Sequence, residues 1–162
     1  MSFYHIVKSL NCKQLFSLFV WFLRHPFYTI ATIQATVQAF QLSQKKFPDI
    51  HGRNNKANAF RHAFWNLLIA KKCARFSGSM ISILTWTKKI TDWHEEFTPN
   101  NALAKAMDLQ NNQVGREMYV RFTNRSVEEM TSTIIAELDE AIKISAVSEI
   151  VRNSGKMVYI ED

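Results

Sequence analysis

The stretch NKANAFRHAFWN at positions 55–66 places three polar side chains in an otherwise apolar and aromatic run. Asn58, His62 and Asn66 follow one another at intervals of four residues, so on a helix they share one face. An imidazole flanked by two carboxamides can bind a metal ion, transfer a proton or hold a polar substrate. The alternative that the same spacing allows is a hydrogen-bonded histidine within the core.

A second segment, TDWHEE at positions 91–96, supplies carboxylates. Asp92, Glu95 and Glu96 fall at three- and four-residue spacing, which puts them on one face of a helix. His94 then points to the edge of that face or away from it.

The third segment, MDLQNNQVGRE at positions 107–117, adds a further acid and more amides. Asp108, Asn112 and Gly115 lie along one helical stripe, with Asn111 beside it. Ionised carboxylates are costly to bury unless they meet a cation, a metal ion or a dense set of donors. Polar groups that converge from three helices therefore favour a metal site inside a helical bundle.

From these residues we expect a metal-assisted hydrolase that acts on a phosphoester, with a lipid as one candidate substrate. A bound cation would lower the pKa of a water molecule and polarise a phosphoryl oxygen. The expected metal is Zn²⁺, Mg²⁺, Mn²⁺ or Ca²⁺, depending on whether a histidine joins the oxygen ligands. In this hypothesis the metal ligands are Asp92, Glu95, Asp108 and His62, the catalytic residues are His62, His94 and Glu95, and the substrate-binding residues are Asn58, Arg61, Asn66, Asn112 and Arg116.

Two alternatives stay open at this point. A metal-free enzyme could pair Asp92 or Asp108 with Glu95 for glycoside cleavage. A non-enzymatic domain could instead dock on a membrane or a partner protein through its N-terminal amphipathic segment, with the polar motifs forming a buried hydrogen-bond network that fixes helix register. Asp108 could then form a structural ion pair with Arg116 or Lys105.

Composition indicates which elements must position these residues. The chain of 162 residues has 4 Gly, 3 Pro and 47% hydrophobic residues, which favours helices joined by short loops. We predict an all-α, single-domain bundle of about five to six helices with a short extended C-terminal tail. The expected helices lie at 15–23, from Pro26 to about 46, and at about 56–76, 80–97, 100–124 and 126–152, with caps at Asn54 or Asn55 and at Ser126.

This pattern divides the chain into three parts. They are a basic, aromatic, amphipathic segment at 1–26, a helical domain at 27–152 that contains the polar motifs at 55–66, 91–96 and 107–117, and a tail at 153–162. Cys12 and Cys73 show no metal-type spacing and are expected to be small buried hydrophobes without a disulfide. The expected core residues of the first motif helix are Phe60, Phe64, Trp65, Leu68 and Ile69.

The positive charge is concentrated in the first half of the chain. Residues 1–75 hold 11 Lys and Arg against one acid, Asp49, and many aromatic residues. This composition suits an anionic membrane surface, with nucleic acid as a less favoured partner and any protein partner unknown. The apolar run at 15–23 is about half as long as a spanning helix. We expect a cytoplasmic protein that is peripheral at the membrane; export, and a targeting role for residues 1–26, stay open alternatives.

Together the three motifs resemble an uncharacterised bacterial domain family. Its members carry N-x-A-[DN]-A-F-R-H-A-x-W-N, then D-x-H-E, then M-D-x-x-N-N-x-x-G-R, and the resemblance spans about residues 54–118. Many members have an acid where this chain has Asn58. The resemblance implies a shared polar site without naming a reaction, and the family's polar positions fall on Asn55, Asn58, Arg61, His62, Asn66, Asp92, His94, Glu95, Asp108, Asn111, Asn112 and Arg116.

Overall fold

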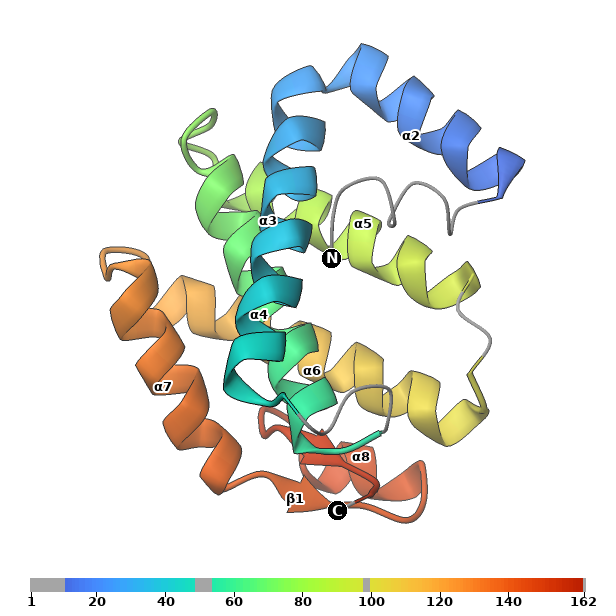
Figure 1. Cartoon of the computed structure of the whole chain (residues 1–162), viewed down its shortest axis with the longest axis vertical. Helices are drawn as coiled ribbons and strands as arrows, with labels where there is room; N and C mark the ends of the chain where they lie inside the picture. The colour runs from blue at the N-terminus through green and yellow to red at the C-terminus, as the bar shows by residue number, and fades with distance from the viewer. Residues whose placement is uncertain (1–10, 49–53, 98–99, 162) are drawn as a thin grey trace.

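The computed structural model describes residues 11–48, 54–97 and 100–161. In this part of the chain seven α-helices, α2 to α8, make up nearly all of the regular structure, with two strands of two residues each (Figure 1). The prediction of an all-α fold is confirmed. Residues 1–10 of the N-terminal segment, and most of the loop predicted before the first motif, lie outside the described residues.

Five helices lie close to their expected positions: α2 (Cys12–Arg24), α3 (Pro26–Lys46), α4 (Lys56–Cys73), α5 (Met80–Phe97) and α6 (Ala102–Arg121). Side-chain caps explain where three of them begin. Asn11 forms a capping box with Gln14 at the start of α2. Asn55 accepts hydrogen bonds from the first turn of α4, and Asn101 does the same for α6. Pro26 occupies the first turn of α3, where its missing N–H costs nothing.

The sixth predicted helix is shorter than expected. α7 (Val127–Asp139) begins at the predicted capping box of Ser126 and Glu129, but it ends at Asp139 and not near 152. Beyond it, β1 (Ile142–Lys143) pairs in parallel with β2 (Val158–Tyr159), and the short α8 (Ser148–Arg152) lies between them. The prediction of one continuous helix was wrong because β-branched isoleucines at alternate positions, 142 and 144, fit a strand better than a helix.

α4 is the central helix of the fold. It packs extensively against α3 and α6, and also against α5 and α7 (Figure 1). Most of its predicted core residues are fully buried, namely Phe60, Phe64, Leu68 and Ile69, whereas Trp65 is half-buried. Cys73 is buried as predicted, but Cys12 is exposed because α2 buries none of its residues.

A glycine lets α4 and α6 cross closely. A Cβ atom on Gly115 would lie 2.0 Å from the carbonyl oxygen of Ala63, so a larger residue cannot occupy this position without moving a backbone. His62 precedes Ala63 directly, and Asn112 precedes Gly115 by three residues. The close crossing therefore holds the polar face of α4 against the polar stripe of α6.

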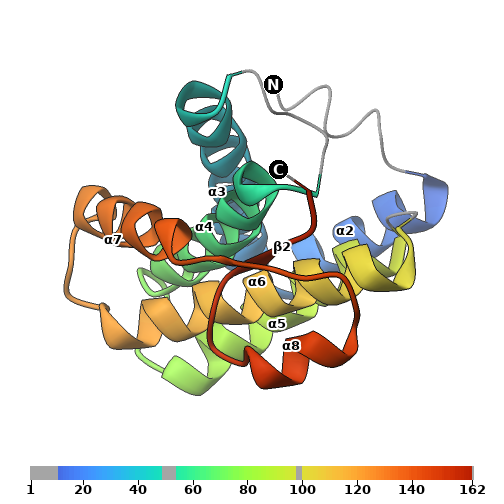
Figure 2. The same ribbon diagram turned by 90° about the horizontal axis from the view of Figure 1, so that it is seen from below.

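Part of the third motif anchors the C-terminal segment. The backbone N–H of Val158 donates to Asn111 Oδ1 at 3.0 Å, and Asn111 Nδ2 donates to the carbonyl oxygen of Val158 at 2.9 Å. Gln110 Nε2 donates to the carbonyl oxygens of Asn153 and Lys156. The segment that contains β2 therefore lies against α6 (Figure 2).

None of the helices in the described ranges combines the length and the hydrophobicity that crossing a membrane requires.

Candidate functional site

A buried polar cluster lies where α4, α5 and α6 meet. Its members are Asn58, His62 and Asn66 from α4, Thr91 and Glu95 from α5, and Asp108 and Asn112 from α6. The four-residue spacing in each helix brings these side chains to one side, as the sequence predicted for α4 and α6. We call this set the polar centre.

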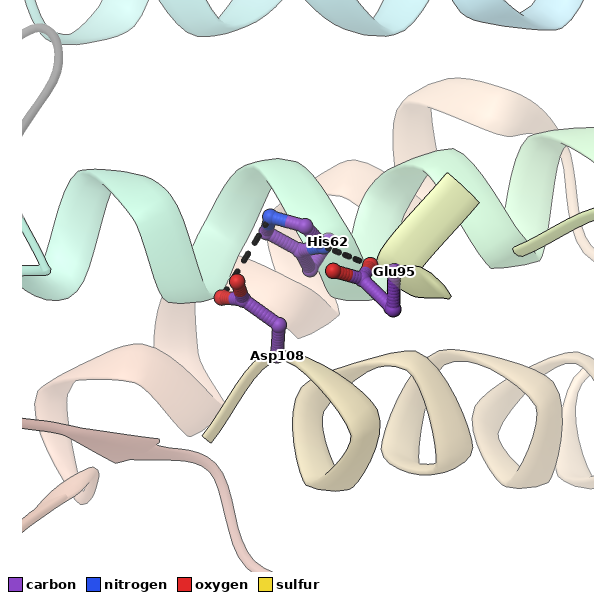
Figure 3. Close-up of side chains that lie close together, drawn as sticks. All are labelled: His62, Glu95 and Asp108. Carbon is purple, nitrogen blue, oxygen red and sulfur yellow. Dashed lines mark ion pairs between the residues drawn. The ribbon is translucent and has the colours of Figure 1, made fainter. Parts of the chain in front are cut away.

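His62 lies between two carboxylates that come from different helices (Figure 3). Its Nε2 is 3.4 Å from Asp108 Oδ1, and its Nδ1 is 3.3 Å from Glu95 Oε1. Nδ1 also lies 3.2 Å from Asn112 Oδ1. The imidazole therefore occupies the space that separates the two acids.

An arginine and two amides surround Asp108. Asn58 Nδ2 donates to Asp108 Oδ1 at 2.9 Å, and Asn100 Nδ2 donates to Asp108 Oδ2 at 2.9 Å. Arg61 Nη2 in turn donates to Asn58 Oδ1. Because a guanidinium can only donate, this contact fixes the carboxamide of Asn58 with its nitrogen toward Asp108.

A longer chain of hydrogen bonds reaches Glu95. Arg116 Nη1 donates to Asn66 Oδ1 at 2.8 Å, and the hydroxyl of Thr91 donates to the same oxygen at 3.1 Å. Asn66 Nδ2 donates to Asn112 Oδ1 at 2.6 Å, and Asn112 Nδ2 donates to Glu95 Oε1 at 2.9 Å. The donor-only guanidinium of Arg116 thus sets the orientation of both amides. We call this series the amide relay.

The amide relay also determines how His62 is protonated. Asn112 Oδ1 is an acceptor, so the nearby His62 Nδ1 must carry a proton and donate it. The other nitrogen, Nε2, faces Asp108 and can either hold a second proton or give its lone pair to a cation.

The two buried carboxylates of the polar centre favour a positive charge on His62. Burial alone would lower the pKa of His62, but the charges of Asp108 and Glu95 outweigh burial and raise it. Burial, with the charge of Glu95, also raises the pKa of Asp108. Burial works in the same direction on Glu95, yet its hydrogen bond and charge interaction with His62 hold the pKa of Glu95 below its usual value.

One carboxylate oxygen is left without a donor. Within the described residues, the buried Glu95 Oε2 has no hydrogen-bond partner, which is costly for a buried acid. One ligand atom from each of His62, Glu95 and Asp108 lies within 4.8 Å of the others. Ligand atoms bound at about 2.1 Å to one cation lie roughly 3–4 Å apart, so to bind a small divalent ion this group would have to contract and His62 would have to shift from its place between the two acids.

Two predicted residues lie outside the polar centre. Asp92 forms an ion pair with Lys88 on the outer side of α5, and it is absent from the group that could share a cation. The structure therefore does not bring Asp92 to the other predicted metal ligands. His94 is exposed next to Glu95 in the chain, with its ring edge-on to Trp65 at a centroid distance of 5.2 Å.

The two predicted phosphate-binding arginines lie at different ends of the polar centre. Arg61 contacts Asn58, whereas Arg116 contacts Asn66, eight residues further along α4. Arg116 also lines a surface hollow of about 300 Å³ beside Leu84 and Lys88. The two guanidinium groups are thus not arranged as a single clamp.

Sequence reasoning missed two contributors to this site. Thr91 precedes Glu95 by four residues, so the spacing rule that selected Asn58 and His62 would also have found it. Asn100 lies before α6, where no helical period marks it, and only its contact with Asp108 identifies it.

Comparison with known proteins gives one match. A family model described as Domain of unknown function (DUF6973) matches residues 19–144, a range that contains all three polar motifs. The expected resemblance to an uncharacterised domain family is confirmed. No curated protein and no solved structure matches the chain.

Proposed function

Because the chain belongs to the DUF6973 family, whose function is unknown, its activity must be argued from the polar centre, and we propose that this centre binds one divalent cation and hydrolyses phosphoesters. The observation that carries the proposal is a set of three buried ligand residues, one from each of three helices, with donor atoms within 4.8 Å of one another. Facing helices of a bundle commonly supply metal ligands in this way.

The ligands would be His62, Glu95 and Asp108. One imidazole nitrogen with two carboxylates suits Zn²⁺ or Mn²⁺ better than Mg²⁺ or Ca²⁺, which prefer oxygen ligands alone. His62 would bind through Nε2, since Nδ1 is committed to Asn112. Glu95 would bind through Oε2, which has no hydrogen-bond partner in the described chain. Three protein ligands leave positions for water and substrate, which is typical of catalytic sites.

Hydrolysis follows from the chemistry of such a site. The cation would lower the pKa of a bound water and polarise a phosphoryl oxygen. The water oxygen then bonds to phosphorus, the bond from phosphorus to the leaving oxygen breaks, and the proton released by water ends on the leaving alcohol. His94, exposed beside Glu95, is the candidate carrier of that proton.

Charge and access favour an anionic substrate. Asn58 and His62 each keep 5% of their surface exposed, whereas Asn66 and Asn112 keep none. Substrate would therefore approach from the side of Asn58, where Arg61 can exchange its amide contact for a phosphate oxygen. Glycoside cleavage is less well supported, because a sugar or water must fit between paired carboxylates and His62 occupies that space.

One observation favours a second candidate function. Both nitrogens of His62 already face carboxylates, so a doubly protonated imidazole could act as the cation and make the centre a purely structural network. The domain would then serve as a non-enzymatic interaction module. The raised pKa of His62 agrees with this arrangement in the absence of metal.

The test is hydrolysis of bis(p-nitrophenyl) phosphate by chelator-treated protein to which Zn²⁺ or Mn²⁺ is added back. We expect activity that depends on metal, is lost in Asp108→Asn and is retained in Asp92→Asn, whose side chain lies outside the polar centre. Absence of metal-dependent hydrolysis from the wild type, with Asp108→Asn strongly destabilised, would favour the structural network instead.

A further inference from the structure

The amphipathic pattern of α2 is inverted relative to an ordinary surface helix. None of its residues is buried, and several of its exposed members are large and apolar, including Phe16 at 68%, Leu23 at 64% and Phe19 at 57%. These three residues share one helical face at three- to four-residue spacing, together with Leu15 and Phe22. We call this set the α2 outer face.

The opposite side of α2 attaches it to the rest of the fold. The ring of Trp21 makes edge contacts with Trp86 at 6.2 Å and with Trp93 at 5.0 Å, and the ammonium group of Lys89 lies 5.0 Å from its centroid. Because α2 is fixed through Trp21, its apolar side is held away from the protein core. Figure 1 shows α2 at one end of the molecule, and α8 near the other.

The start of α3, the next helix along the chain, also exposes apolar side chains. Phe27 and Ile30 are exposed there, and Phe27 stacks on the exposed Phe76 at a centroid distance of 5.2 Å. Scattered surface hydrophobics need no explanation, but several large apolar side chains on one face of a helix mark an interaction site.

The charges around this surface identify the kind of partner. Lys13 and Arg24 stand near the two ends of α2 and are exposed, and no acid occurs anywhere in residues 11–48. Phenylalanines on one face with basic residues at its flanks match the boundary between anionic headgroups and acyl chains. Thirteen residues are too few to span a bilayer, so such a helix lies in the plane of the interface.

We propose that the α2 outer face, with Phe27 and Ile30, docks the protein on an anionic phospholipid surface. The phenylalanines enter the headgroup boundary, while Lys13 and Arg24 pair with lipid phosphates. This surface is independent of the proposed hydrolase, since none of its residues belongs to the polar centre.

The test is co-sedimentation of the full chain with vesicles of phosphatidylcholine that contain about one third phosphatidylglycerol. The expected result is binding that weakens with salt and is much poorer on pure phosphatidylcholine. The triple variant Phe16→Ser/Phe19→Ser/Leu23→Ser should lower the partition coefficient by at least about tenfold. The matched control is Val147→Ser/Val151→Ser, which removes exposed apolar side chains near α8 and should bind like the wild type.

Three outcomes would overturn the proposal: no binding of the wild type to anionic vesicles, equal binding of the triple variant, or a solution dimer that the triple variant dissociates. The last result would make a second copy of the chain the occupant of this surface. Circular dichroism and metal content of each variant are measured alongside. If the triple variant stays folded and keeps its metal but fails to bind vesicles, membrane docking and the proposed metal site are shown to depend on different residues.

Discussion

At the scale of single residues, asparagine side chains connect the arginines to the carboxylates. A carboxamide offers both a donor and an acceptor, so an arginine at its oxygen dictates that its nitrogen faces the next acceptor. Arg61 acts on Asp108 through Asn58, and Arg116 acts on Glu95 through the amide relay. The sequence motifs identified these residues. The orientation of each carboxamide could be determined only from its hydrogen bonds in the structure.

We expect Arg116→Met to weaken metal binding, although Arg116 is not one of the proposed metal ligands. Loss of the guanidinium frees Asn66 and Asn112 to rotate, and changes behind the direct ligands typically cost about 10–100-fold in metal affinity. Titration with Zn²⁺ measures the change, and ¹⁵N NMR of His62 in the loaded protein should show a proton on Nδ1 in the wild type. Arg121→Met, an exposed change on the same helix, is the control. Unchanged affinity in Arg116→Met would show that the relay does not position the ligands.

A second prediction at this scale concerns the relay itself. Asn112→Ala removes the donor to Glu95 Oε1 and the acceptor for Asn66, leaving buried polar groups unpaired. We expect a loss of about 1–3 kcal/mol in the free energy of unfolding. Urea denaturation checks this value against Gln113→Ala, whose side chain is exposed on the same helix and should change little. Equal stability of the two variants would contradict the hydrogen-bond assignment.

At the scale of elements, the site depends on how three helices are rotated relative to one another. The period of the sequence correctly grouped Asn58 with His62 and Asn66, because four-residue spacing defines a face. The period could not distinguish Asp92 from Glu95, since both fit the same stripe and only the packing of α5 decides which one points inward. In the same way, the capping box gave the start of α7, whereas its end depends on pairing with a distant strand.

The crossing of α4 and α6 gives an element-scale prediction. Gly115→Ala would force the Ala63 backbone away, and because no flexible side chain can yield, we expect a loss of about 3 kcal/mol or more. For a chain of this length that corresponds to a drop of roughly 6–12 °C in Tm. Gly78→Ala is the matched control, since a Cβ there has no neighbour within 4 Å among the described residues. Similar Tm values for both variants would refute the close crossing.

At the scale of the whole molecule, the two cysteines differ in burial. Cys73 lies in the core, and burial raises the pKa of its thiol from 9.0 to about 12. Cys12 is exposed on α2. When folding raises the pKa of a thiol, the contribution of that thiol to the stability of the folded state is fully present at pH values below the pKa in the unfolded chain. This contribution is lost as the pH rises through the pKa in the folded chain.

We therefore expect the stability of the protein to fall as pH rises from about 9 toward about 12, and Cys73→Ala to lessen that fall. Denaturation at several pH values measures the slope, and Cys12→Ala, which alters an exposed thiol, should leave it unchanged. If the pH dependence of stability were the same in Cys73→Ala and in the wild type, the thiol would have the same pKa in the folded and the unfolded chain, which would contradict the prediction.

Three helices contribute different parts of the molecule. α4 carries three of the seven residues of the polar centre on one side and core phenylalanines on the other. α6 adds the anchor for the C-terminal segment, and α2 presents its apolar face outward. Composition predicted the helical fold. The orientation of α2 could not be predicted, because an apolar helical stripe is equally compatible with burial in a core.

Binding of one metal ion by the polar centre can be tested by measuring the metal stoichiometry of the protein. Elemental mass spectrometry would be applied to purified wild-type protein, to Glu95→Gln and to Asp92→Asn, after each is loaded with Zn²⁺ or Mn²⁺ and desalted. The account predicts one metal ion per chain in the wild type and in Asp92→Asn, and none in Glu95→Gln with the fold intact. A wild type that retains no metal, or a Glu95→Gln variant that retains as much as the wild type, would contradict it.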